Sequence, residues 1–153
     1  ISANSLRQTM PYCFAETQYP GVPSINLHTI HPHEHLKIGD FDITPFQVMH
    51  DKLPILGYKI NNLAYITDMK TIADEEMELI KGVDILVENA LRWDKPHHSH
   101  QLVGDAVNFA RCVGAKHTYL VHANHDIGKH DDINKRLPDD IRYAYDGQVL
   151  LCP

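Results

Sequence analysis

Three polar residues of the sequence stand where apolar, strand-like segments end. Loops at strand ends are where catalytic groups gather in layered α/β folds. A carboxylate between two neutral imidazoles is a ligand set that suits Zn²⁺, Mn²⁺ or Fe. No regular ligand spacing such as CxxC or HExxH is present, so spacing alone leaves a metal site and three unrelated polar residues equally open. The residues are His50 after residues 43–49, Asp68 after residues 63–67 and His122 after residues 118–121.

Histidine is the compositional anomaly of the chain, with twelve among 153 residues, which makes metal or acid/base chemistry worth testing. The net charge of −6 with neutral histidines argues against strong electrostatic binding to nucleic acid or to an anionic membrane. Apolar runs are far shorter than the roughly 20 residues that cross a bilayer, and no secretory signal opens the chain. The sequence therefore predicts a cytoplasmic protein without membrane partners.

A hairpin is predicted over residues 55–67, with Asn61–Asn62 as its two-residue loop. Asparagine tolerates the positive φ of a type I′ turn. Counting back along this register places Ile55 opposite Asp68, at the sheet end where the segment after His50 begins. We therefore expect His50 and Asp68 to be neighbours.

Helices and strands alternate in the second half, which predicts an α/β fold with α+β layering. The helix over residues 99–113 has an apolar stripe, with Ser99 as its N-cap and Gly114 at the C′ position. A last hairpin is predicted near Asp146–Gly147. The length predicts one domain over residues 1–153, whose opening residues resemble a helix begun upstream, as in an N-terminal truncation. The other predicted strands cover residues 25–30, 41–49, 84–88 and 117–121, and the other helices cover residues 73–81 and 130–137.

The segments around the candidate ligands resemble one protein family. Residues 48–68 are similar to the "xH…GY…AYxTD" region of metallo-β-lactamase-fold hydrolases, and within them to the phosphonate-operon cyclic phosphodiesterase and ribonuclease Z branch. Residues 96–100 and 120–125 resemble the "SH" and "THxxH" segments of that branch, and residues 144–147 its terminal "YDG". The resemblance covers nearly the whole chain from about Phe41 onward.

The resemblance implies a two-metal centre. His50 corresponds to a ligand of one divalent ion, His122 to a ligand of the other, and Asp68 to the carboxylate that bridges them. The ions would be Zn or Mn, with Fe as a further option. Two such ions polarise a phosphoryl group and activate water for hydrolysis, so Asp68 counts among the catalytic residues.

The resemblance also implies residues that act on the substrate. His100 corresponds to a histidine beside the substrate phosphate, where it donates a proton or stabilises charge. Ser99, at the predicted helix start, would contact phosphate oxygens. His125 would contact the substrate or orient a ligand, and Glu88 or Asn89 would orient a catalytic imidazole.

One departure from the family limits these expectations. The family's N-terminal HxHxDH motif is absent, and its nearest imitation, residues 31–35, is interpreted as a polar loop. The chain then corresponds to the C-terminal half of an αββα sandwich. We expect it to be inactive alone, and to associate with the missing N-terminal half or form a homo-oligomer. The intact protein would hydrolyse small phosphodiesters. The alternatives are thioester or lactone hydrolysis on the same fold, and a non-catalytic metal-binding or scaffold module.

Overall fold

The computed structural model describes residues 2–151, which fall into two compact units that divide between Ile30 and His31. The first unit holds α1 (Ser2–Thr9) and the 3₁₀ helix η1 (Pro11–Phe14). The predicted strand over residues 25–30 is wrong, because this segment has extended chain but no neighbouring strand to pair with among the described residues of its unit. The expectation of one domain over residues 1–153 stays a prediction.

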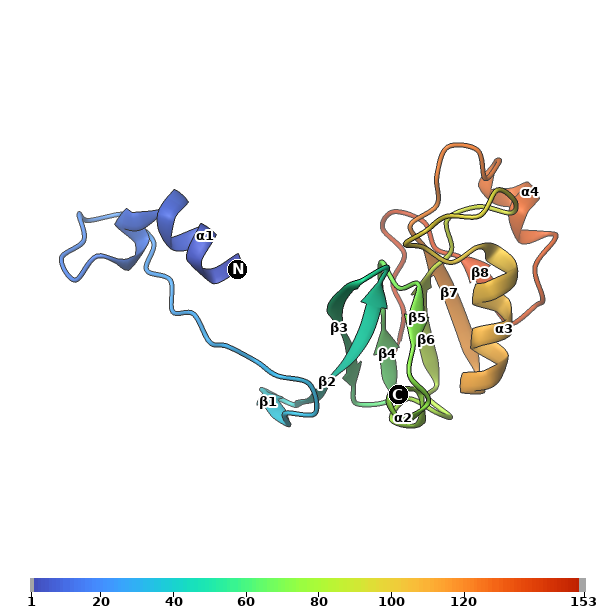
Figure 1. The fold of residues 1–153 in the computed structure, drawn as a ribbon, viewed down its shortest axis with the longest axis horizontal. Coiled ribbons are helices and arrows are strands. Elements are labelled where there is room, and N and C mark those ends of the chain that lie inside the picture. Colours follow the sequence, from blue (N-terminus) through green and yellow to red (C-terminus); the bar gives the residue numbers. More distant parts are fainter. Residues whose placement is uncertain (1, 152–153) are drawn as a thin grey trace. The chain divides into compact units, whose positions relative to one another are not determined.

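The second unit is built on one mixed sheet (Figure 1). Its order is β1-β2-β3-β4-β6-β7-β8, and β5 pairs with β2. Pairing is antiparallel from β1 to β4 and parallel from β4 through β6 and β7 to β8. The strands are β1 (Leu36–Ile38), β2 (Phe41–His50), β3 (Leu53–Ile60), β4 (Leu63–Tyr65), β5 (Thr71–Ile72), β6 (Ile85–Asn89), β7 (His117–Val121) and β8 (Ile141–Tyr143).

Helices pack against the sheet, one against β2 and two against the parallel strands β6 and β8, which confirms the predicted α/β layering (Figure 1). They are α2 (Asp74–Glu78), α3 (Val103–Val113) and α4 (His130–Asn134). As predicted, α3 ends at Gly114 in the left-handed conformation, with φ of 70°. It begins later than predicted, because the Asp105 carboxylate accepts the Leu102 amide at 3.1 Å and caps the helix there. Ser99 is therefore not the N-cap.

The hairpin is confirmed in its register but ends early. Ile60 pairs with Leu63 as predicted, and Asn61 has φ of 50°, but Asn62 lacks the positive φ that a type I′ turn requires. The ladder stops at Tyr65, and the Ile66 amide donates instead to the Val87 carbonyl at 2.8 Å. Asp68 therefore does not pair opposite Ile55, as the counted register had predicted.

The predicted last hairpin is wrong. A turn is present at residues 146–147, with Gly147 at φ of 83°, but no strand follows it within residues 2–151. β8 pairs in parallel with β7 instead, so it enters the sheet after a crossover through α4.

The core lies on one face of the sheet and continues into the buried side of α3. The register aligns Ala64, Leu86 and Thr118 across three strands, and all three are buried. Phe46 lies further along this face, on β2, and is fully buried. Within the described residues, no helix is both long enough and apolar enough to span a membrane.

Gly57 on β3 provides a test of this packing. A Cβ at this position would lie 2.6 Å from the tip of the fully buried Phe46 ring. We expect Gly57→Ala to lower the free energy of unfolding by about 1–3 kcal/mol, since the ring must shift within a packed core. Urea denaturation measures this, with Gly104→Ala on α3 as the control, because its Cβ would meet nothing within 4 Å. Equal stability of the two variants would contradict the described packing.

Candidate metal centre

The candidate residues lie on segments that meet at one end of the sheet. His50 is the last residue of β2, and Asp68 lies on the loop that follows β4. His100 precedes α3, and His122 directly follows β7. Because β4, β6 and β7 run parallel, their carboxyl ends share one edge of the sheet, where the loops carrying these side chains meet.

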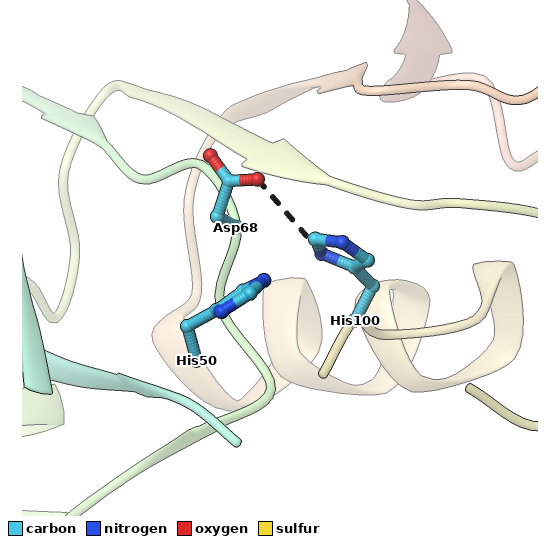
Figure 2. Close-up of side chains that lie close together, drawn as sticks. All are labelled: His50, Asp68 and His100. Carbon is cyan, nitrogen blue, oxygen red and sulfur yellow. Dashed lines mark ion pairs between the residues drawn. The ribbon is translucent and has the colours of Figure 1, made fainter. Parts of the chain in front are cut away.

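The three imidazoles gather around the Asp68 carboxylate. His122 Nε2 lies 3.0 Å from Asp68 Oδ1, and His100 Nδ1 lies 4.0 Å from the same oxygen. Figure 2 shows His50, Asp68 and His100 pointing toward one another, and their ligand atoms lie within 4.8 Å of each other. The His100 ring centroid is 4.8 Å from that of His50 and 4.4 Å from that of His122. The structure thus brings together His50, Asp68, His100 and His122.

The backbone at two of these residues is strained. Asp68 has φ of 61° and His122 has φ of 62°, in the left-handed region that non-glycine residues enter at a cost. Such conformations persist where surrounding structure fixes them, and they cluster at functional sites. The side chains of these two residues approach each other to 3.0 Å, so the strained backbone positions are those that bring the carboxylate and the imidazole together.

Asn89 fixes the loop that carries Asp68. Its Oδ1 accepts the Met69 amide at 2.6 Å, and its Nδ2 donates to the Met69 carbonyl at 2.9 Å. We had predicted that Asn89 or Glu88 orients an imidazole, but the Asn89 side chain instead clamps the backbone next to Asp68. Glu88 is fully buried, neither of its oxygens has a partner among residues 2–151, and burial raises its pKa well above the ordinary value.

Two further residues belong to the cluster and were not assigned to it from the sequence. The His97 ring stacks on that of His100, with centroids 4.8 Å apart and planes 19° apart. Lys70 Nζ donates to the His100 carbonyl at 3.1 Å. The sequence signals were the position of Lys70 two residues after Asp68 and the histidine run at residues 97–100.

The remaining candidates lie apart from the carboxylate. Ser99 is buried, and its amide donates to His97 Nδ1 at 3.3 Å, so its contact with the cluster is through the His97 ring. The His125 side chain is 91% exposed and lies 3.3 Å from Asp126. The roles of Ser99 and His125 in substrate binding stay predictions.

The histidines of the polar loop over residues 31–35 do not gather into a site. His33 Nε2 lies 2.9 Å from Glu76, whereas His35 Nε2 lies 3.5 Å from Asp42. These two imidazoles therefore face different carboxylates, as expected for a polar loop.

The surroundings of His100 favour its neutral form. Burial lowers the pKa of His100 to about 4, assisted by the neighbouring rings of His122, His50 and His97 and opposed by Asp68. A neutral imidazole has the free lone pair that a metal ligand needs. His100 Nδ1 is buried and has no hydrogen-bond partner among the described residues, so it is free to contact a bound group. The nitrogen and carboxylate donors thus fit a divalent transition-metal ion.

Comparison with known proteins adds independent findings. Residues 2–123 match the model of the β-lactamase superfamily domain. Over 144 residues the chain is 38% identical to a protein of Porphyromonas gingivalis named octanoyltransferase, covering 94% of this chain and 29% of that protein. A crystal structure of a diphosphatase from the PhnP family is similar, with a TM-score of 0.83 and 33% identity, over 96% of this chain and 53% of the other.

A more distant likeness concerns the fold alone. The short form of human tRNase Z superposes with a TM-score of 0.61 at 19% identity, over 77% of this chain and 44% of the other. The chain therefore spans less than a third of the curated relative and about half of the diphosphatase.

The first prediction at this site concerns the His100 titration. In the metal-free chain, NMR should give His100 a midpoint near pH 4, against 6.5 for an ordinary histidine. Between these values the unfolded state binds more protons, so stability should fall as the pH drops from 6.5 to 4. His100→Gln should flatten this slope. A midpoint for His100 above 6 would show that the ring is not desolvated as described.

The second prediction concerns metal affinity. Asp68→Ala should weaken Zn²⁺ or Co²⁺ binding by more than about 100-fold, because even partners outside the ligand shell cost 10–100-fold. Calorimetric titration of the chain measures this. Asp131→Ala is the control, since this carboxylate is 93% exposed and lies against His130, away from the cluster. Equal affinities of the two variants would exclude Asp68 as a ligand.

Proposed function

Because this chain belongs to the β-lactamase superfamily and has the metallo-β-lactamase fold, we propose that its His/Asp cluster is the metal centre of a hydrolase that cleaves phosphodiesters. The observation that carries the proposal is the convergence of His50, His100 and His122 on the Asp68 carboxylate. The 33% identity to a PhnP-family diphosphatase supports a phosphate-containing substrate.

The proposed ligands are His50, Asp68 and His122. Asp68 presents two oxygens, and imidazoles stand around it, which suits a carboxylate shared between two cation positions. Bound Zn²⁺ or Mn²⁺ would supply Lewis acidity toward a phosphoryl oxygen and lower the pKa of water. The Asn89 clamp holds the Asp68 loop while charge develops on the substrate.

His100 is the proposed catalytic side chain beside the substrate. With its pKa lowered to about 4, it stands uncharged in the free site at neutral pH and offers a neutral N–H to a phosphate oxygen. A bound anionic phosphate raises the pKa of a nearby imidazole, because opposite charge stabilises the imidazolium. His100 then gains the proton that a departing alkoxide requires.

The charge around the cluster favours an anionic substrate. Burial lowers the pKa of His97, as do the neighbouring His98 and the positive charges of Arg92 and Lys70. Positive groups thus gather at this end of a chain whose net charge is −6. A neutral thioester or lactone gains little from such a field, whereas a phosphodiester gains directly.

An acyl substrate is the second candidate, because the relative at 38% identity is named octanoyltransferase. The chain covers 29% of that protein, so its name applies to a much longer polypeptide. A non-catalytic metal-binding module is the third candidate.

We further propose that the ligand set is completed from outside these 153 residues. Three ligands are too few for a tight two-metal site. Association with a polypeptide that supplies the rest, or with a second copy of this chain, would provide the missing groups. On this proposal the chain by itself is inactive and acts in the cytoplasm only once completed.

Substrate class is tested with the full-length gene product loaded with Zn²⁺ or Mn²⁺. We expect hydrolysis of bis(p-nitrophenyl) phosphate to exceed that of octanoyl thioesters. His100→Ala should lower kcat by roughly 10²–10⁴-fold, the usual loss when an acid or base is removed. His35→Ala is the control, because it removes an exposed imidazole that contacts Asp42 and is not part of the cluster. Faster thioester cleavage would replace the proposal by the acyl candidate, and metal binding without either activity would favour the non-catalytic module.

A further inference from the structure

Two loops supply His97, His100 and His122 to the cluster, and a backbone hydrogen bond joins the loops. The first histidine loop, residues 90–102, carries His97 and His100, and the second histidine loop, residues 122–129, carries His122. The Asn124 amide of the second loop donates to the Leu91 carbonyl of the first at 3.0 Å. This contact lies close to the start of each loop, shortly after strands β6 and β7 end.

Trp93 makes a second connection between the two loops. Its indole Nε1–H donates to the Ile127 carbonyl at 3.2 Å, from the first histidine loop to the second. The Arg136 guanidinium, just beyond α4, lies 3.7 Å from the centre of the indole ring. Trp93 therefore connects the first histidine loop, to which it belongs, with the second histidine loop and with the segment after α4.

The two ends of the first histidine loop are hydrogen-bonded to each other beside Trp93. The Leu91 amide donates to the Gln101 carbonyl at 3.0 Å, and the Val103 amide donates to the Arg92 carbonyl at 3.0 Å. Gln101 directly follows His100, so movement of residues 91–93 moves His100. The bond from Trp93 to Ile127 thus connects the segment that places His100 to the loop that begins with His122.

We propose that Trp93 is a positioning residue of the metal centre, latching the two histidine loops so that His100 and His122 face the Asp68 carboxylate together. This inference rests on the proposed metal centre. The centroids of the two rings are 4.4 Å apart, so a small relative shift of the loops changes the spacing of their nitrogens substantially. His122 is a proposed ligand, and ligand bonds of about 2 Å tolerate little displacement.

A packing role makes a different prediction from a positioning role. Trp93 is half-buried against the core, so its ring also fills space. Packing requires the ring but not the indole N–H. Trp93→Phe keeps an aromatic ring beside Arg136 and removes the donor to Ile127, which separates the two roles.

The test is a Co²⁺ titration of the chain followed by visible absorption, which reports on ligand geometry. Trp93→Phe should bind Co²⁺ roughly 10-fold more weakly, as expected when a group that supports a ligand is lost, with a shifted absorption band. The matched control is Arg111→Gln, which removes the surface pair with Asp140 at the other end of α3. It should bind Co²⁺ like the parent chain with an unchanged band.

A second measurement needs no variant, because Trp93 is the sole tryptophan of the sequence and gives a single indole N–H signal in NMR. Co²⁺ is paramagnetic, so Zn²⁺ is used here. Zn²⁺ should slow hydrogen exchange at this N–H at least several-fold, since binding and latching are thermodynamically linked.

The outcomes separate the two levels of inference. Unchanged affinity and spectrum in Trp93→Phe overturn the latch and leave the metal centre standing. If that variant fails to fold, the exchange measurement decides, and an unchanged rate on adding Zn²⁺ overturns the latch. If the parent chain binds neither ion, the titration is repeated with the full-length gene product, and absence of binding there as well overturns the metal centre and the latch together.

Discussion

The position of the Asp68 carboxylate depends on where the β3–β4 hairpin stops. β4 pairs with β3 and with β6 over the same three residues, but after Tyr65 only the bonding to β6 continues, through the Ile66 amide, toward the edge where the parallel strands end. Asn89, the last residue of β6, then holds Met69 through both backbone groups. The strained φ at Asp68 persists because this clamp and the sheet fix the residues on both sides.

Sequence reasoning found the strand ends more reliably than the contacts between them. The end of β7 at Val121 and the Ile60–Leu63 register follow from local patterns, so His122 was placed correctly and Asp68 was expected near His50. The Asn89 clamp and the stacking of His97 depend on loops meeting in space, which no local pattern encodes. The start of α3 was misplaced because Ser99 and Asp105 both favour helix starts, and tertiary contacts chose the later one.

Burial, assisted by the neighbouring imidazoles, lowers the pKa of His100 and keeps this ring uncharged at neutral pH. The rings of His50, His97 and His122 all oppose a proton on His100, and the single carboxylate offsets them only in part. The His100 imidazole is thus held in the neutral form, which has a free lone pair. Such an arrangement is costly in the absence of a cation and is relieved when one binds, which is the usual link between metal binding and folding.

The switch from antiparallel to parallel pairing at β4 has a consequence for the order in which the molecule assembles. β1 to β4 are joined by short turns, so this meander closes small loops, whereas Ile85 must find His117 across an entire helical connection. Local pairing is faster, because less chain entropy is lost. His50 is therefore in place early, while His100 and His122 arrive with the late, long-range half. Capture of a cation would mark the last stage of folding in this chain and not its nucleus.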